Sequence, residues 1–143
     1  MTAGRGWNKD AGMLPIPLSH IALVALGGAI GAASRFVTVH LVTHRTLGTS
    51  LPWGTFAVNL IGSFLIGAVL MTTLESDSGN RLRLLLVTGF LGGFTTFSAF
   101  SWELTEMLME RRVGAAALYS FGSVLMCLTA TFAGALLMRT FAR

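Results

Sequence analysis

Four long apolar segments account for most of this chain, and they constrain its fold more than any other feature. They run over residues 18–42, 53–74, 82–108 and 114–138. Each is close to or longer than the roughly 20 residues that an α-helix needs to cross a bilayer. Only 11% of the residues are charged, against roughly 25% in soluble domains. We therefore predict an all-α membrane protein with four transmembrane helices and no enzymatic activity.

The remainder of the chain consists of short connections and a polar N-terminal stretch, residues 1–17. We expect a single transmembrane domain over residues 18–143 and no separate soluble module. The first apolar segment is too long for a signal peptide and contains Arg35. It is therefore expected to stay in the protein as its first span.

Basic residues are scattered singly or in pairs near the ends of the apolar segments, although the net charge is +4. This distribution is typical of interfacial anchoring and not of a nucleic-acid surface, so no nucleic-acid partner is expected. Four spans would place both termini on one side of the membrane. The charge bias between the two sides is weak, which permits insertion in both orientations. One side would carry Arg5, Lys9, Arg81, Arg83, Arg139 and Arg143. The other would carry Arg45, Arg111 and Arg112, joined by Arg35 if its side chain extends to that surface.

The third apolar segment is interrupted by glycines and hydroxyl residues between Gly89 and Glu103, where it reads GFLGGFTTFSAFSWE. This composition predicts a broken helix. A break inside the membrane persists only where protein or a water-filled cavity surrounds it, because hydrocarbon offers no hydrogen-bond partners. Freed carbonyls suit a small hard cation, and the N-terminus of the following half-helix suits an anion. The break is therefore a candidate ion or substrate site.

Phenylalanines recur every three or four residues in the same segment, which predicts rings on roughly one face of a helix. Such a stripe is usually a packing surface. Here glycines and threonines lie between the rings, so main-chain and hydroxyl groups adjoin them. The edge of a phenyl ring carries the positive end of its quadrupole and can favour an anion. The four positions are Phe90, Phe94, Phe97 and Phe100.

Three polar residues in the apolar segments each allow two interpretations. Asn59 either joins helices by hydrogen bonds or serves a site, where its amide offers two donors without a formal charge. Arg35 either extends to the headgroups or lines a vestibule that attracts anions. Glu103 is either an interfacial acid or a membrane acid that handles protons. The residues alone leave these alternatives open.

Small and hydroxyl residues follow helical spacings in the first and fourth segments. Gly27 and Gly31 form a small-xxx-small pair, which predicts a close approach between helices. Tyr119, Ser123 and Cys127 are four residues apart and share one helix face. That row either forms interhelical hydrogen bonds or lines a polar path. Cys127 is the only cysteine, and its apolar surroundings predict a buried packing residue.

His40 and His44 have the i, i+4 spacing of a helical metal pair. They lack carboxylate or thiolate partners nearby, so we favour a location at the water interface over a metal site.

Three motifs together resemble the Fluc (CrcB) family of fluoride channels. They read GGAIGAASRF at residues 27–36, GTFAVNLIGSF at 54–64 and GFLGGFTTFSAF at 89–100. The resemblance extends in order over all four spans and leaves out the N-terminal stretch. It implies a multi-pass channel in the bacterial inner (plasma) membrane that lets fluoride leave the cytoplasm passively. It also implies an antiparallel, dual-topology homodimer with a broken third helix, two pores and a central sodium ion.

The same resemblance implies roles for individual residues. Gly92 and Thr95 would offer backbone carbonyls to sodium at the dimer interface, and Arg35 would lie near a vestibule. Cys127 departs from the family pattern, which has a hydroxyl residue there, and Ala99 stands where threonine is common. The pore residues would be Asn59, Phe97, Phe100, Tyr119 and Ser123.

Two rival functions come from other classes of protein. A small four-span, proton-coupled exporter would need a titratable acid deep in the membrane, and Glu103 is the candidate. A non-transporting membrane subunit would use its polar residues only for packing. The fluoride-channel interpretation instead predicts fluoride, sodium, membrane lipid and a second copy of the chain as partners.

Overall fold

The computed structural model describes residues 16–46, 48–49, 51–72 and 77–141. Most of the predicted N-terminal stretch, residues 1–15, lies outside the described residues. Within the described ranges every regular element is helical. In chain order they are α1 (Leu18–Arg45), α2 (Trp53–Thr72), α3 (Asp77–Arg83), the π-helix η1 (Leu84–Leu91), α4 (Gly92–Phe94), α5 (Phe97–Met109) and α6 (Val113–Phe141).

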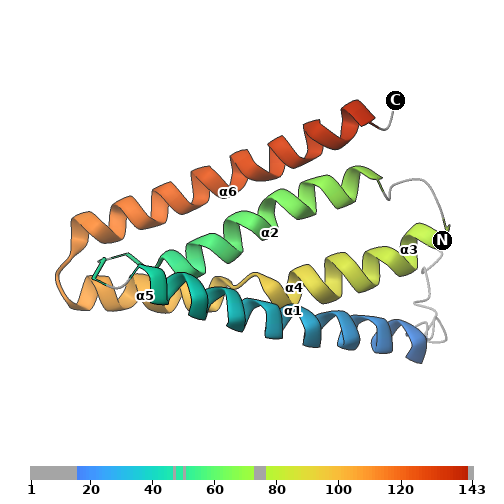
Figure 1. Ribbon diagram of the computed structural model, residues 1–143, viewed down its shortest axis with the longest axis horizontal. Helices are drawn as coiled ribbons and strands as arrows, with labels where there is room; N and C mark the ends of the chain where they lie inside the picture. The colour runs from blue at the N-terminus through green and yellow to red at the C-terminus, as the bar shows by residue number, and fades with distance from the viewer. Residues whose placement is uncertain (1–15, 47, 50, 73–76, 142–143) are drawn as a thin grey trace, which may run out of the picture.

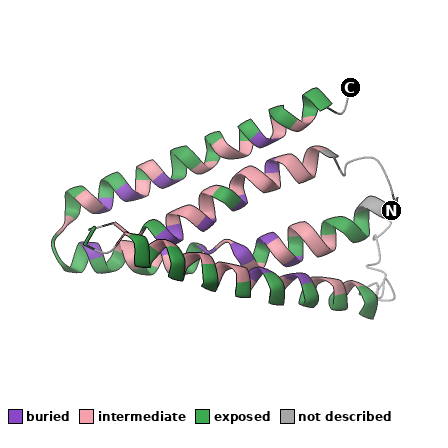
Figure 2. Ribbon diagram, viewed as in Figure 1, coloured by how far each residue is buried: buried purple, intermediate pink, exposed green. Residues whose placement is uncertain are grey.

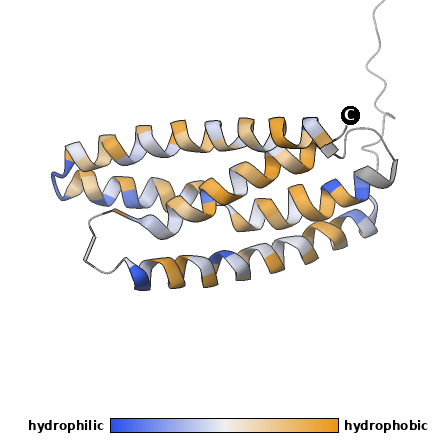
Figure 3. Ribbon diagram, turned by 45° about the horizontal axis from the view of Figure 1, so that its top comes forward, coloured by the Kyte–Doolittle hydropathy of each residue, from blue (hydrophilic) through white to orange (hydrophobic). Residues whose placement is uncertain are grey.

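Four helical stretches are long and apolar enough to cross a membrane. This confirms the predicted all-α chain with four candidate spans. The four stretches lie side by side, and α1 begins at the same end of the molecule at which α6 ends (Figure 1). Hydrophobic residues occur along the length of each of the four stretches (Figure 3). The four stretches are Leu18–Arg45, Trp53–Met71, Asn80–Met109 and Val113–Phe141.

Glycines allow α1 to pack directly on the main chain of the third span. A Cβ atom at Gly27 would collide with the carbonyl oxygen of Leu85, and one at Gly31 with that of Phe90. Both glycines are buried. The close approach predicted from their spacing is therefore confirmed, and its partner is the segment formed by η1 and α4.

A second glycine contact joins α2 to α6. A Cβ atom at Gly67 would collide with the carbonyl oxygen of Thr131, and one at Gly134 with that of Phe64. The molecule thus consists of two closely packed pairs, one of α2 with α6 and one of α1 with the η1–α4 segment.

Few residues are buried in the single chain (Figure 2), and many large apolar side chains are exposed. Val58 in α2 is completely inaccessible, whereas large apolar residues such as Phe36 and Phe121 are mostly exposed. Exposed apolar side chains are unfavourable in water, so these surfaces are suited to lipid or to another protein chain.

Candidate functional site

Two residues of extended chain separate α4 from α5 in the middle of the third span. Thr95 has φ −83° and ψ 157°, and Thr96 has φ −149° and ψ 115°. Helical hydrogen bonding cannot continue through such dihedral angles. Thr96 then serves as the N-cap of α5, because its Oγ1 accepts a hydrogen bond from the amide of Ala99 at 3.2 Å.

Asn59 of α2 pairs with both main-chain groups of Thr96. Its Oδ1 accepts from the Thr96 amide at 2.8 Å, and its Nδ2 donates to the Thr96 carbonyl at 3.0 Å. These bonds replace the helical partners that the extended conformation removes, as a hydrocarbon environment requires. Asn59 therefore joins α2 to the third span, and one N–H of its amide remains for another acceptor.

Arg35 of α1 approaches the same two-residue stretch. Its Nη1 donates to the carbonyl oxygen of Thr95 at 3.3 Å, and its side chain is half-buried. The guanidinium thus contacts the C-terminal end of α4, where carbonyl oxygens without helical donors carry partial negative charge. Side chains of α1 and α2 bind successive residues of the break.

The carbonyl oxygens of Gly92 and Thr95 lose the donors that a continuous helix would give them. The amide of Thr96 donates to Asn59 instead of to Gly92, and the amide of Ala99 donates to the Thr96 hydroxyl instead of to Thr95. These are the two carbonyls for which the family resemblance implied cation binding. The Thr95 oxygen accepts the Arg35 hydrogen bond, and a carbonyl has a second lone pair.

A cavity of about 370 Å³ lies beside the break, between α2, the third span and α6. It brings together Asn59, Gly92, Thr95, Phe97, Phe100 and Ser123, residues that the sequence had singled out from three separate segments. Ser63, Thr96 and Cys127 also line it. Tyr119 does not; it lines a second cavity of about 200 Å³, which shares Ser123 with the first.

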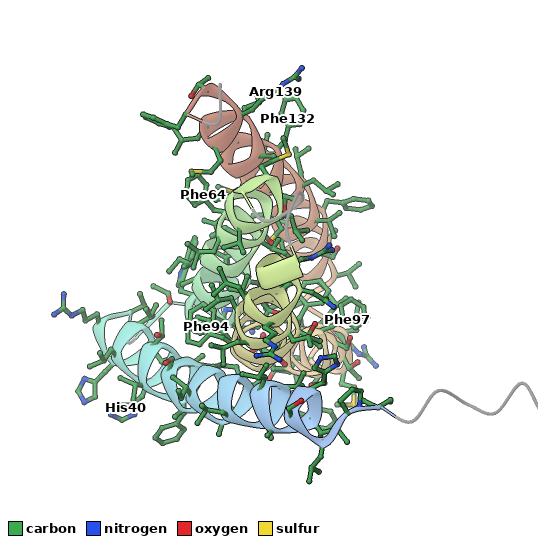
Figure 4. All side chains as sticks on the ribbon, turned by 90° about the vertical axis from the view of Figure 1, so that its right-hand side faces the viewer. His40, Phe64, Phe94, Phe97, Phe132 and Arg139 are labelled. Carbon is green, nitrogen blue, oxygen red and sulfur yellow. The ribbon has the colours of Figure 1, made fainter. Side chains whose placement is uncertain are left out.

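The four phenylalanines do not share one face, because the extended residues divide them into two pairs. Phe90 stacks on Phe94 with ring centroids 5.7 Å apart, and Phe97 packs against Phe100 at the same distance. Phe94 is 6% exposed, whereas Phe97 is 79% exposed. Figure 4 shows Phe94 and Phe97 on different sides of the third span. The expectation of a single aromatic stripe is therefore wrong.

Ser123 and Cys127 lie one turn apart on α6. Ser123 is 7% exposed, and its Oγ has no hydrogen-bond partner in the described structure. A buried hydroxyl without a partner is unfavourable, so this donor is available to a ligand. Cys127 is partly accessible at the cavity wall, in contrast to the buried packing residue that its apolar surroundings predicted.

Glu103 joins α5 to two other spans. Its Oε1 accepts from the Thr55 hydroxyl of α2 at 2.5 Å, and its Oε2 accepts from the Tyr119 hydroxyl of α6 at 2.9 Å. Sequence reasoning did not identify Thr55. Its position four residues before Asn59 places both on one face of α2, which was the available signal.

His40 and His44 are exposed near the end of α1, with ring centroids 5.9 Å apart. No third histidine, cysteine or carboxylate in the described part of the chain joins them in a group that could hold a metal.

The fold and the cavity define a small, multi-span membrane protein with polar groups gathered at an interruption of one span. A family model described as CrcB-like protein, Camphor Resistance (CrcB) matches residues 22–135. The chain belongs to the CrcB family, which confirms the resemblance carried by its three motifs.

Several curated proteins are similar to this chain over most of its length. One from Chelativorans sp. is 49% identical over 123 residues, which cover 85% of this chain and 97% of the relative. One from Thermus thermophilus is 47% identical over 112 residues, covering 78% and 89%. One from Novosphingobium aromaticivorans is 46% identical over 119 residues, covering 82% and 94%. All three are named fluoride-specific ion channel FluC.

Proposed function

We propose that this chain forms a fluoride-selective channel that lets fluoride leave the cytoplasm passively across the bacterial plasma membrane. The observation that carries the proposal is the meeting of Asn59, Phe97, Phe100 and Ser123 in one cavity beside the break. Membership of the CrcB family and the names of the relatives support it. Conduction of this kind makes and breaks no covalent bond, so the protein is a channel and not an enzyme.

The cavity offers fluoride several weak donors and no carboxylic acid among its lining residues. Ser123 contributes a hydroxyl without a partner, and Asn59 retains one N–H after pairing with Thr96. Donors of this kind can replace part of the hydration of a small anion without trapping it by a full charge. The rings of Phe97 and Phe100 complete the wall, and ring edges favour anions without offering a proton.

The N-terminus of α5 adds a further attraction for an anion. Thr96 caps the amide of Ala99 but leaves the amides of Phe97 and Ser98 without an acceptor in the described part of the chain. Unpaired N–H groups and the positive end of the helix dipole stabilise negative charge. Because Phe97 also lines the cavity, we place fluoride near this end of α5.

The proposal includes an antiparallel, dual-topology homodimer in which the third span crosses the membrane as two half-helices meeting at Thr95 and Thr96. The exposed ring of Phe97 supports a second copy, because an aromatic ring assigned to the pore wall needs a facing partner. The weak bias of basic residues at the span ends is compatible with two opposite orientations.

We also propose a sodium ion at the interface between the two copies. The residues fit it, since the carbonyls of Gly92 and Thr95 have lost their helical donors and oxygen is the ligand that hard cations prefer. One chain supplies two such oxygens, which are too few for a hard cation alone. When bound, the ion would supply positive charge that neutralises these carbonyls.

The proton-coupled exporter is not supported. The relatives described above carry the name of an ion channel. Glu103, the acid that an exporter would use, is hydrogen-bonded between Thr55 and Tyr119 and does not line the cavity beside the break.

Anion efflux from liposomes tests the proposed function. Purified protein is reconstituted with matched internal fluoride and chloride, and valinomycin carries potassium as the counter-ion. Rapid fluoride release with negligible chloride release, without any pH gradient, is the expected result. Equal release of both anions would remove the selectivity, and release of neither from folded protein would favour the non-transporting subunit.

A further inference from the structure

The half-buried carboxylate of Glu103 is the centre of a hydrogen-bonded triad formed by three spans. Thr55 of α2 is 2% exposed, and Tyr119 of α6 is buried with it. Each hydroxyl donates to a different oxygen of the same carboxylate, at 2.5 Å and 2.9 Å. Hydrogen bonds to a carboxylate are among the stronger ones in proteins, so the triad fixes all three side chains.

Tyr119 has one hydroxyl hydrogen, and Glu103 accepts it. The same hydrogen cannot be donated to fluoride while this bond exists. The Tyr119 side chain also lies outside the cavity that contains Asn59. Its influence on that cavity therefore comes from the position of its ring and not from its hydroxyl.

The Tyr119 ring leads directly to the aromatic wall of the cavity. Its centroid lies 5.2 Å from that of Phe100, with 42° between the ring planes. Phe100 in turn lies 5.7 Å from Phe97, and both of these rings line the cavity. A continuous series of contacts thus runs from the carboxylate to the rings that we assign to the anion path.

We propose that Glu103 is a positioning residue for anion selectivity, which holds Tyr119 and thereby fixes the orientation of Phe100 at the cavity wall. The inference rests on the proposed fluoride channel and assigns Glu103 a role other than proton transfer. The edge and the face of a phenyl ring carry opposite partial charges. A Phe100 ring that is free to reorient would distinguish a small anion from a large one less well.

Single hydroxyl deletions test this role with little change in volume. Tyr119→Phe and Thr55→Val each remove one bond to Glu103. Thr105→Val is the matched control, because the Thr105 hydroxyl lies on the same α5 helix and, among the described residues, donates to the Ser101 carbonyl of that helix and not to Glu103. The readout is the ratio of fluoride to chloride efflux from liposomes, at equal amounts of protein that elutes as a single folded species.

We expect Tyr119→Phe to lower the fluoride-to-chloride ratio by about tenfold, the scale of one hydrogen bond to a carboxylate. Thr55→Val should shift the ratio in the same direction, and Thr105→Val should leave it unchanged. Glu103→Gln should retain most of the ratio, because the amide can accept from Tyr119 and donate to Thr55. A double variant of Glu103→Leu with Tyr119→Phe should be no worse than Glu103→Leu alone.

An unchanged ratio in Tyr119→Phe, with fluoride conduction intact, would overturn the positioning role and leave the channel function standing. Complete loss of fluoride efflux in folded Glu103→Gln protein would also overturn it, because that result requires the charge or the proton of the acid. Absence of fluoride efflux from the unmodified protein would instead refute the channel function on which the inference rests.

Discussion

Asn59 and Thr96 form a reciprocal pair in which one side-chain amide satisfies both main-chain groups of a residue on another span. The two distances, 2.8 Å and 3.0 Å, are those of ordinary hydrogen bonds. The pair joins α2 to the start of α5 at the point where helical bonding stops. Asn59 therefore shapes the break in addition to lining the cavity beside it.

Replacing Asn59 by aspartate should sharply reduce fluoride efflux. Aspartate cannot donate to the Thr96 carbonyl, and leaving a buried acceptor unpaired costs about 1–3 kcal/mol. The change also places an acceptor and a possible negative charge in the path proposed for an anion. We expect a decrease of about tenfold or more in the initial rate of fluoride efflux from liposomes, the scale of that lost interaction.

Ser63→Ala is the matched control for this substitution, because Ser63 lies one turn further along α2 and lines the same cavity. It should reduce efflux much less. Normal fluoride flux through correctly assembled Asn59→Asp protein would contradict both roles of the asparagine.

The Arg35→Lys variant separates charge from hydrogen bonding at the break. A vestibule that only attracts anions needs a positive charge, which lysine keeps. The bond to the Thr95 carbonyl depends on the reach and fixed geometry of the guanidinium, which lysine does not reproduce. We expect a lower melting temperature and slower fluoride efflux. The melting temperature is measured by thermal unfolding in detergent, and fluoride efflux by the liposome assay. If Arg35→Lys protein has the wild-type melting temperature and the wild-type efflux rate, Arg35 acts only by attracting anions with its charge.

Alanine substitutions in the α1 glycines should have very different effects one turn apart. Gly31→Ala would place a methyl group against the main chain of Phe90, where no side chain can move aside. Overpacking of this kind costs about 1–3 kcal/mol. Gly28→Ala is the control, since its Cβ would lie 3.8 Å from the nearest atom, the Gly89 carbonyl oxygen. Thermal unfolding should show a large loss only for Gly31→Ala, and equal losses would refute direct main-chain contact.

Phe97 should matter for conduction more than for the fold of the single chain. It is 79% exposed, the same fraction as Phe121 of α6, which lines neither cavity. Phe97→Leu should therefore slow fluoride efflux strongly, whereas Phe121→Leu should leave it nearly unchanged. Both variants should insert and fold. Equal efflux from the two would remove Phe97 from the proposed path.

Much of this arrangement could be predicted because it depends on patterns within single segments. Segment length and hydropathy were enough for the four candidate spans. The spacing of Gly27 and Gly31 was enough for a close contact, since a helix repeats every 3.6 residues. Glycine and threonine enrichment indicated where the third span would depart from a regular helix, and the cavity lies there.

Relationships between segments were harder to predict. The aromatic stripe was misjudged because two extended residues change the direction of every ring that follows them. The triad of Glu103 combines one residue from each of three spans. The spacing of Thr55 from Asn59 places both on one face of α2, but it does not reveal that Glu103 on another span is the partner of Thr55. The pairing of the Asn59 side chain with both main-chain groups of Thr96 was likewise not predictable, because it depends on where the third span places Thr96 beside α2.

The glycine contact between α1 and the η1–α4 segment has a mechanical consequence. At Gly27 and Gly31 the obstructing atoms belong to the main chain of the third span. A helix that rests on a main chain cannot slide or roll without separating from it, whereas one that rests on long side chains can be accommodated by changes of rotamer. We therefore expect the first span and the η1–α4 segment to move together, and any adjustment that admits an ion to take place mainly in α2, α5 and α6.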